Sequence, residues 1–452
     1  MKLHFPARLG RQHALLLLGC LTALQLLAAI YFYHRLRTTG YLPSPFVYDK
    51  TDTFMDLYNT MYWAGMPGRY SIWGSVYPPL AFLVLDALRA LFVPTFPFSG
   101  PHALRAGSPS LQIALCAAYL LLPALALSLR AWRDFRRSER VLMYFAAITS
   151  LPFLFALERG NLILLAPPLL VLLADDRPAL RIVALALLIN LKPYFAVLFL
   201  AYAARQWWDE LVMAVMVTGL LYLGTSVLIG ANPVSMMLNL VHFGQSASVF
   251  SLREVLSFPS SVSAFSTVLA NPRFLASKYA HIALDPTALA ALINAAKWTI
   301  IAITLLGIFR RGRDLPIIAI FAILIVVTTN LGTSVGGYSL IFYLAIIPAM
   351  LRMRFRTWYL LLLAAIFVPL DPFATIVSND IGRQVAYLSG QNVDVTWRLG
   401  LATAMRPLLN LALTALMGAE LNWRDTRVAA RSDNSSSLKQ DRMDPHGTNL
   451  VA

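Results

Sequence analysis

Residues 13–33 read HALLLLGCLTALQLLAAIYFY, a run that contains no Asp, Glu, Lys or Arg. About 20 predominantly apolar residues are enough to cross the hydrocarbon core of a bilayer as one helix. The run is too long for the apolar part of a cleaved signal peptide, and no small-residue cleavage site follows it. Because Lys2, Arg8 and Arg11 precede it, we expect an uncleaved anchor whose N-terminal side lies inside the cell.

The composition extends this expectation to the whole chain. Of the 452 residues, 58% are hydrophobic and 13% are charged, whereas about a quarter of the residues in a soluble domain are charged. The mean hydropathy is +0.65, and the further apolar runs lack the two-residue alternation of barrel strands. Only helices and closed barrels satisfy their backbone groups in lipid. The sequence therefore predicts an all-α, polytopic transmembrane bundle of about 11–13 spans, some short or broken.

The net charge of +15 reflects membrane topology rather than nucleic-acid binding. Lys and Arg gather in short segments between apolar runs, at 130–140, 310–313 and 352–356. Cytoplasmic loops carry such an excess of positive charge. We therefore expect a multi-pass protein of the cytoplasmic membrane, with a transmembrane domain over 1–421 and a polar, disordered cytoplasmic tail over 422–452.

The parity of the spans fixes two further expectations. Residues 77–93 are apolar but contain Asp86 and Arg89, which are costly at the bilayer centre, so we expect a helix along the outer interface. A single helix over residues 181–205 would place the later basic loops outside the cell, so this segment must enter and leave the membrane on the same side. Two short helices that meet at Lys192-Pro193 satisfy this requirement, because proline interrupts a helix.

The other spans follow the remaining apolar runs. We expect them at 111–129, 141–157, 161–174, 211–229, 288–309, 315–330, 337–351, 358–370 and 399–417. Residues 230–287 and 371–396 then form two long outer loops. Cys20 and Cys116 lie inside apolar runs without metal-ligand spacing, so we expect no disulfide.

The first outer segment combines acids with aromatic residues. Asp49, Asp52 and Asp56 stand close together, and a carboxylate of this kind is able to take a proton from a sugar hydroxyl. A solvated loop with an interfacial aromatic belt is the alternative interpretation. The aromatic residues that follow Asp56 are Tyr58, Tyr62, Trp63, Tyr70 and Trp73.

Two cationic positions accompany the apolar runs. Arg159, within Glu158-Arg159-Gly160-Asn161, either pairs with Glu158 at the interface or faces a bound phosphate. Lys192 either extends to the outer interface or neutralises a departing lipid phosphate. In the long outer loop, His242, Arg253, Glu254, Lys278 and His281 are either structural or contact phosphate or acceptor.

The order of these motifs resembles the GT-C membrane glycosyltransferases, and most closely glycosyltransferase family 87. The matching residues are Asp56-Leu57-Tyr58, Tyr77-Pro78-Pro79-Leu80, Gly160-Asn161 and Lys192-Pro193. Family members include polyprenyl-phosphate-mannose-dependent mannosyltransferases, with arabinofuranosyltransferases as relatives in the superfamily. The family's turn often reads Gly-Gln-x-Asn, whereas Glu158 and Arg159 precede Gly160-Asn161 here.

The resemblance implies a fold of GT-C type and an inverting transfer of a mannosyl or arabinofuranosyl group from a polyprenyl phosphate at the outer face. It implies Asp56 as the general base, with Asp52 as the second choice. No cofactor is implied, the use of a divalent metal is left open, and the acceptor is a glycan, a lipid or a protein. The donor phosphate would be bound by Arg159, Lys192, His242 and Arg253, and the sugar or acceptor by Tyr58, Tyr62, Trp63, Tyr77, Glu158 and Asn161.

Two other functions compete with this one. A lipid-linked glycan flippase or transporter is the first, although such proteins often repeat a broken helix in two halves and this chain shows one break. A polysaccharide polymerase or ligase with a diphosphate-linked donor is the second, and Arg253 and His281 in the long outer loop keep it open.

Overall fold

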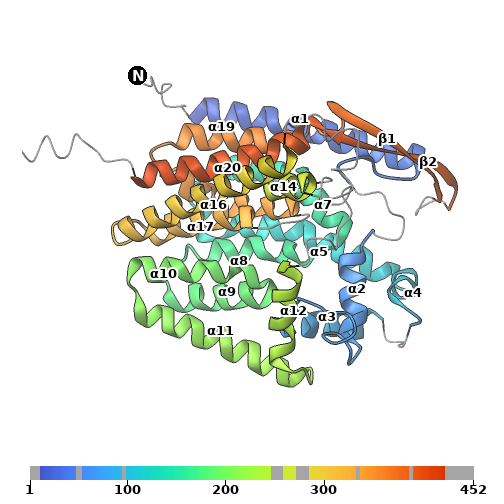
Figure 1. Cartoon of the computed structure of the whole chain (residues 1–452), viewed down its shortest axis with the longest axis horizontal. Coiled ribbons are helices and arrows are strands. Elements are labelled where there is room, and N and C mark those ends of the chain that lie inside the picture. Colours follow the sequence, from blue (N-terminus) through green and yellow to red (C-terminus); the bar gives the residue numbers. More distant parts are fainter. Residues whose placement is uncertain are drawn as a thin grey trace, which may run out of the picture.

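The structure, a computed structural model, describes residues 11–46, 53–93, 98–245, 258–270, 285–331, 336–385 and 390–422. These residues form a helical bundle with one two-stranded sheet (Figure 1). Five helices are long and apolar enough to cross a membrane. They are α1 (Arg11–Thr39), α5 (Pro109–Ser128), α11 (Trp208–Leu228), α16 (Pro286–Arg311) and α20 (Leu401–Asn422). The predicted all-α bundle is confirmed, and the chain is an α-helical membrane protein.

Shorter apolar helices complete the bundle. They are α6 (Arg137–Ile148), α7 (Leu151–Arg159), η2 (Leu162–Leu165) with α8 (Ala166–Leu172), α9 (Pro178–Leu191), η3 (Pro193–Leu198) with α10 (Phe199–Arg205), α17 (Ile317–Leu331), η5 (Gly337–Phe342) with α18 (Tyr343–Met350), and α19 (Arg356–Phe367). The span expected at 141–157 is bent, because α6 and α7 meet at an angle of 53°, as in a broken span or a re-entrant loop. Pro152, near the start of α7, lacks the N–H that would continue the ladder of α6.

The break at Lys192-Pro193 is confirmed. Helix α9 ends at Leu191, Lys192 is extended (φ −145°, ψ 115°), and η3 begins at Pro193. The residue before a proline is sterically driven out of the helical region. Lys192 therefore stands at an interruption between two short helices, as its sequence context predicts.

One end of the bundle gathers the arginine-rich segments, and we call it the basic end. Arg352 pairs with Asp134 at 2.9 Å, which joins two of these segments. Arg205, at the end of α10, donates a hydrogen bond of 2.6 Å to the carbonyl oxygen of Leu315. Basic segments that are far apart in the sequence thus meet at one end, as the charge distribution predicts.

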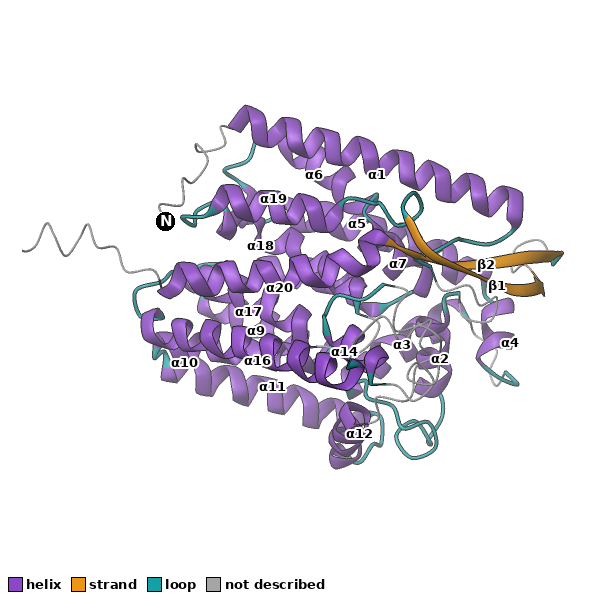
Figure 2. Ribbon diagram, turned by 45° about the horizontal axis from the view of Figure 1, so that its top comes forward, coloured by secondary structure: helices purple, strands orange, loops and turns teal. Residues whose placement is uncertain are grey.

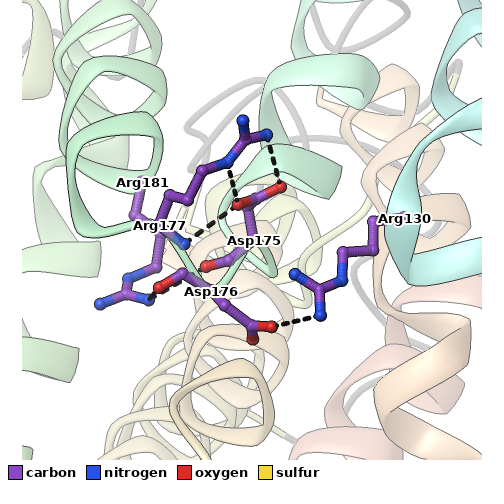
Figure 3. A network of polar contacts seen from close by, with 5 residues as sticks. All are labelled: Arg130, Asp175, Asp176, Arg177 and Arg181. Carbon is purple, nitrogen blue, oxygen red and sulfur yellow. Dashed lines mark hydrogen bonds and ion pairs between the residues drawn. The ribbon is translucent and has the colours of Figure 1, made fainter.

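A charge cluster at the basic end ties the start of α9 to the end of α5 (Figure 3). Arg130 pairs with Asp176 at 2.6 Å, and Arg181 donates to the carbonyl oxygens of Asp175 and Asp176. Hydrogen bonds from Arg177 lower the pKa of Asp175 to about 2. Asp175 therefore stays ionised at neutral pH.

The opposite end carries the short elements and is called the hairpin end (Figure 2). Its helices are α2 (Met55–Ala64), α3 (Pro79–Phe92), α4 (Pro101–Ala106) and α12 (Pro233–Gln245). The helix expected at 77–93 is confirmed as α3, in which Asp86 and Arg89 pair at 2.7 Å. Its position along a membrane interface stays a prediction, as does the disordered tail over 422–452, of which the structure describes only Asn422, the last residue of α20.

The two long outer loops contain regular structure that we did not expect. Strands β1 (Thr375–Val385) and β2 (Asn392–Gly400) form an antiparallel hairpin in the segment expected as a loop at 371–396. Val393, Val395 and Trp397 alternate with polar residues in β2, the period of a strand. The other loop contains α12 and α14 (Ser263–Leu269). We expected these segments only as long connections between spans, and the sequence analysis did not predict their helices or the hairpin.

Candidate functional site

The candidate site is built around the carboxylate of Asp56, in the first turn of α2. Arg159, at the end of α7, donates to its Oδ1 at 3.2 Å, and Asn161 donates to its Oδ2 at 2.7 Å. The side chains of Asp56 and Arg159 are 23% and 17% exposed. The carboxylate is thus held on both oxygens yet open to a small molecule, since each oxygen keeps a second acceptor position.

Asn161 is fixed by its role at the start of η2. Its Oδ1 accepts a hydrogen bond of 3.0 Å from the backbone N–H of Ile163, and its side chain is buried. Because the amide oxygen is used in this cap, the amide nitrogen must face Asp56. The Gly160-Asn161 motif therefore orients the carboxylate as well as starting a helix.

Gly160 allows α2 to approach α7 closely. Its φ is +64°, and a Cβ built on it would lie 3.0 Å from Leu57 Cβ and 3.2 Å from Phe54 Cδ1. Phe54 is itself left-handed (φ 61°), and its N–H donates to the carbonyl oxygen of Glu158 at 2.8 Å. A non-glycine residue in this conformation stores backbone strain, which clusters at functional sites.

We predict that Gly160→Ala lowers the free energy of unfolding by about 1–3 kcal/mol, since it combines left-handed strain with crowding. Gly230→Ala is a matched control, because Gly230 has φ +62° with no atom near its missing Cβ. Chemical unfolding in detergent micelles measures both. Equal losses in the two variants would show that contact with α2 does not matter.

Lys192 lies at the same site. Its Nζ stands 3.9 Å from the ring centroid of Tyr77, and Asp56 and Tyr338, which belongs to η5, are among the ionisable groups near it. Within the described part of the chain, this ammonium group makes no hydrogen bond and no ion pair. A cation that rests on an aromatic face keeps its three donors for an anion.

Aromatic side chains extend the site along α2. Asp56, Thr60 and Trp63 share one face of this helix by their spacing. Trp63 stacks on Trp73 with ring centroids 6.4 Å apart, and Tyr62 meets Trp73 edge-on at 6.1 Å. Trp63 lies about 10 Å along the helix from Asp56, so the rings are within reach of a sugar bound at the carboxylate.

The remaining predicted residues lie elsewhere. The ring of Tyr58 is fully buried and its hydroxyl donates to the carbonyl oxygen of Ser108 at 3.2 Å, so it offers no face to a sugar. His242 is exposed on α12, and no contact in the described residues joins it to Asp56. The backbone carbonyl oxygen of Glu158 accepts the N–H of Phe54 at 2.8 Å. Asp52 and Arg253 lie outside the described residues.

The structure adds Thr60 and Tyr338 to the site. Thr60 Oγ1 donates to the backbone oxygen of Asp56 at 2.7 Å. Tyr338 stacks on Phe155 with centroids 6.3 Å apart. Tyr338 could have been found from the sequence, because Gly336-Gly337-Tyr338-Ser339 opens a span from the same side as Asp56.

No three His, Cys, Asp or Glu side chains of the described residues lie together as a metal-binding group. Comparisons of the chain with protein-family models, curated proteins and solved structures found no significant match. The composition and bundle therefore define the class, an α-helical membrane protein, while its activity is argued from the site alone.

Proposed function

We propose that this chain is a GT-C-like glycosyltransferase that moves a single sugar from a polyprenyl phosphate to an acceptor hydroxyl. One observation carries the proposal: Arg159 and Asn161 hold the Asp56 carboxylate on α2, and the Lys192 ammonium lies 3.9 Å from the ring of Tyr77, which lies just before α3, a helix that packs against α2. A positioned carboxylate with an ammonium group near it that is unpaired within the described residues suits a reaction that has a proton to remove and a phosphate to release.

The proposed reaction is a single displacement. The acceptor oxygen forms a bond to the anomeric carbon while the bond from that carbon to the phosphate oxygen breaks, which inverts the configuration. The hydroxyl proton passes to Asp56, a step of general base catalysis. The phosphate leaves with the bonding electron pair, and Lys192 stabilises the charge that develops on it.

Arg159 has a different task in this scheme from the one we expected. Its Nη2 already donates to Asp56 Oδ1, so it orients the carboxylate, and in this scheme the guanidinium bridges the carboxylate and the donor phosphate. A planar guanidinium with five donors is suited to such bridging. Trp63 and Trp73 supply the apolar wall that a sugar ring packs against.

The charge distribution supports an outward-facing site. The Arg-rich segments lie at the basic end and Asp56 lies at the hairpin end (Figure 2). If the basic end is cytoplasmic, as positive loops favour, the site opens to the outer face of the cytoplasmic membrane. A donor whose lipid stays in the outer leaflet then needs no nucleotide.

The test uses purified protein in nanodiscs, a synthetic polyprenyl-phosphate sugar, a cell-envelope acceptor extract and no nucleotide. Formation of a new glycosidic bond, with inverted configuration, supports the proposal. Labelled lipid that only crosses the bilayer would support a flippase. A product that forms only from a diphosphate-linked donor would support a polymerase or ligase. Either of these outcomes overturns the proposal.

We predict that Lys192→Met lowers kcat/KM for the polyprenyl-phosphate donor by about 10²–10³-fold, because the variant removes a cation from the departing phosphate. Lys192→Arg keeps the charge and should retain more activity. Steady-state kinetics with the donor varied measures the effect. Equal activity of the Met variant and the unchanged protein would remove Lys192 from the mechanism.

A further inference from the structure

Helix α12 carries an apolar stripe that no other part of the described chain covers. Val234, Met237, Leu238 and Val241 follow the spacing i, i+3, i+4 and i+7, which places them on one face. Their exposed fractions are 56%, 47%, 54% and 58%. The helix runs across the axis of the bundle (Figure 1), so the stripe follows the plane in which the bundle ends rather than the direction of the spans.

The opposite face of α12 is attached to the protein. Met236 is 1% exposed, and Asn239 Nδ2 donates to the carbonyl oxygens of Tyr70 and Ser75 at 2.8 and 3.1 Å. These carbonyls belong to the segment 65–78 between α2 and α3, which we call the site loop. One face of α12 thus holds the site loop, and the other is bare.

The bare stripe continues the lipid-facing surface of α11. Leu220, Leu223, Val227 and Leu228 of α11 are exposed by 66%, 51%, 79% and 71%, and α11 is one of the helices of membrane length. Only residues 229–232 separate the two helices. Because α12 contains no Asp, Glu, Lys or Arg, nothing in its composition opposes contact with lipid chains.

We propose that α12 is an interfacial helix whose stripe lies among the lipid chains of the leaflet at the hairpin end, and that Asn239 fixes the site loop at that depth. The occupant of the stripe is therefore membrane lipid. Tyr70 Oη donates to the carbonyl oxygen of Tyr77 at 2.9 Å, and Tyr77 lies beneath Lys192. The helix thereby sets the height of Lys192 and Tyr77 relative to lipid headgroups, a consequence that rests on the proposed function.

The first experiment measures the position of the stripe. The two cysteines of the chain, Cys20 and Cys116, are replaced by serine, and L238C and V241C are labelled with an environment-sensitive fluorophore in nanodiscs. N232C is the control, since Asn232 is exposed in the turn between α11 and α12. Nitroxide-labelled lipids should quench the probes at 238 and 241 at least about twofold more than the probe at 232, as for a helix at the acyl boundary.

Two results would contradict the proposal that the stripe lies among lipid chains. In the first, the probe at 238 is quenched no more than the probe at 232, which places the stripe in water. In the second, the probe at 238 is shielded from nitroxide lipids and shows energy transfer to a second labelled copy, which makes the stripe a contact between two chains. Neither result depends on sugar transfer, so the position of the stripe in lipid is tested separately from the proposed function.

The second experiment measures the link through Asn239. Asn239→Leu keeps the size of the side chain and removes both donors, and hydrogen exchange of residues 65–78 should become about tenfold faster because two hydrogen bonds are lost. Ser235→Ala, on the same helix, is the control. If hydrogen exchange of residues 65–78 is unchanged in Asn239→Leu while nitroxide lipids still quench the probe on α12, Asn239 does not hold the site loop.

Discussion

Asp56→Asn is expected to lower the rate of sugar transfer by about 10²–10⁴-fold, the range that a positioned general base contributes. The amide matches the carboxylate in size but offers only one acceptor oxygen, so either Arg159 or Asn161 loses its hydrogen bond, and the amide is unable to take the proton of the acceptor hydroxyl. The transfer assay described above measures the loss, and single-turnover kinetics with excess enzyme separates it from product release.

Asp86→Asn provides the matched control. Asp86 is also a carboxylate at the hairpin end and pairs with an arginine, Arg89, at 2.7 Å, but no contact joins it to the Asp56 group in the described residues. Its transfer rate should stay within about twofold of the unchanged protein, as for a surface substitution. If Asp56→Asn is fully active, the doubly substituted Asp52→Asn, Asp56→Asn protein decides the matter, and activity in that variant removes the proposed base altogether.

Much of the bundle could be predicted because lipid imposes simple rules on the sequence. Apolar length gave the long helices, and the position of arginines required two short helices at Lys192-Pro193, which the structure contains. The β1–β2 hairpin was missed because it lies outside the apolar runs, where hydropathy carries no signal. The alternation of Val393, Val395 and Trp397 was the evidence that hydropathy alone overlooked.

The site could be predicted only in part, because its contacts join distant segments. Asp56 and Asn161 stand 105 positions apart in the sequence and their side chains are 2.7 Å apart. Composition and motif order selected Asp56, Arg159, Asn161 and Lys192, but they also selected Tyr58, whose ring lies in the core. On α2, Tyr58 is two residues from Asp56, which places it about 200° around the helix and therefore on the buried side.

The backbone conformation of Phe54, which supports α2, also could not be predicted from local sequence. Phe54 adopts φ 61° without being glycine, a conformation that propensity does not predict. It persists because the Glu158 carbonyl accepts its N–H and Gly160 leaves room for its ring. The strain is thus sustained by the turn that also carries Arg159 and Asn161, which couples the shape of α2 to the placement of its acid.

Asp371→Ala is expected to lower the free energy of unfolding by about 3–5 kcal/mol, because it leaves a buried guanidinium without its counter-charge. Arg406, in α20, is 2% exposed, and Asp371 side-chain atoms are 0% exposed. The two form hydrogen bonds of 2.7 and 3.2 Å, and Thr403 donates to Asp371 at 3.0 Å. The ring of Phe258 lies 4.5 Å from the guanidinium carbon, so apolar surroundings leave the unpaired charge little solvation.

Two comparisons identify the cause of this loss. Asp134→Ala breaks the pair with Arg352, whose side chains are 63% and 77% exposed, and should cost under about 1 kcal/mol because water screens such pairs. The double variant Asp371→Leu, Arg406→Met removes both buried charges and should regain most of the stability lost in Asp371→Ala. Urea unfolding in mixed micelles, followed by circular dichroism, measures all three. A double variant no more stable than the single one would mean that the pair holds the start of the β1–β2 hairpin by its hydrogen bonds rather than by charge compensation.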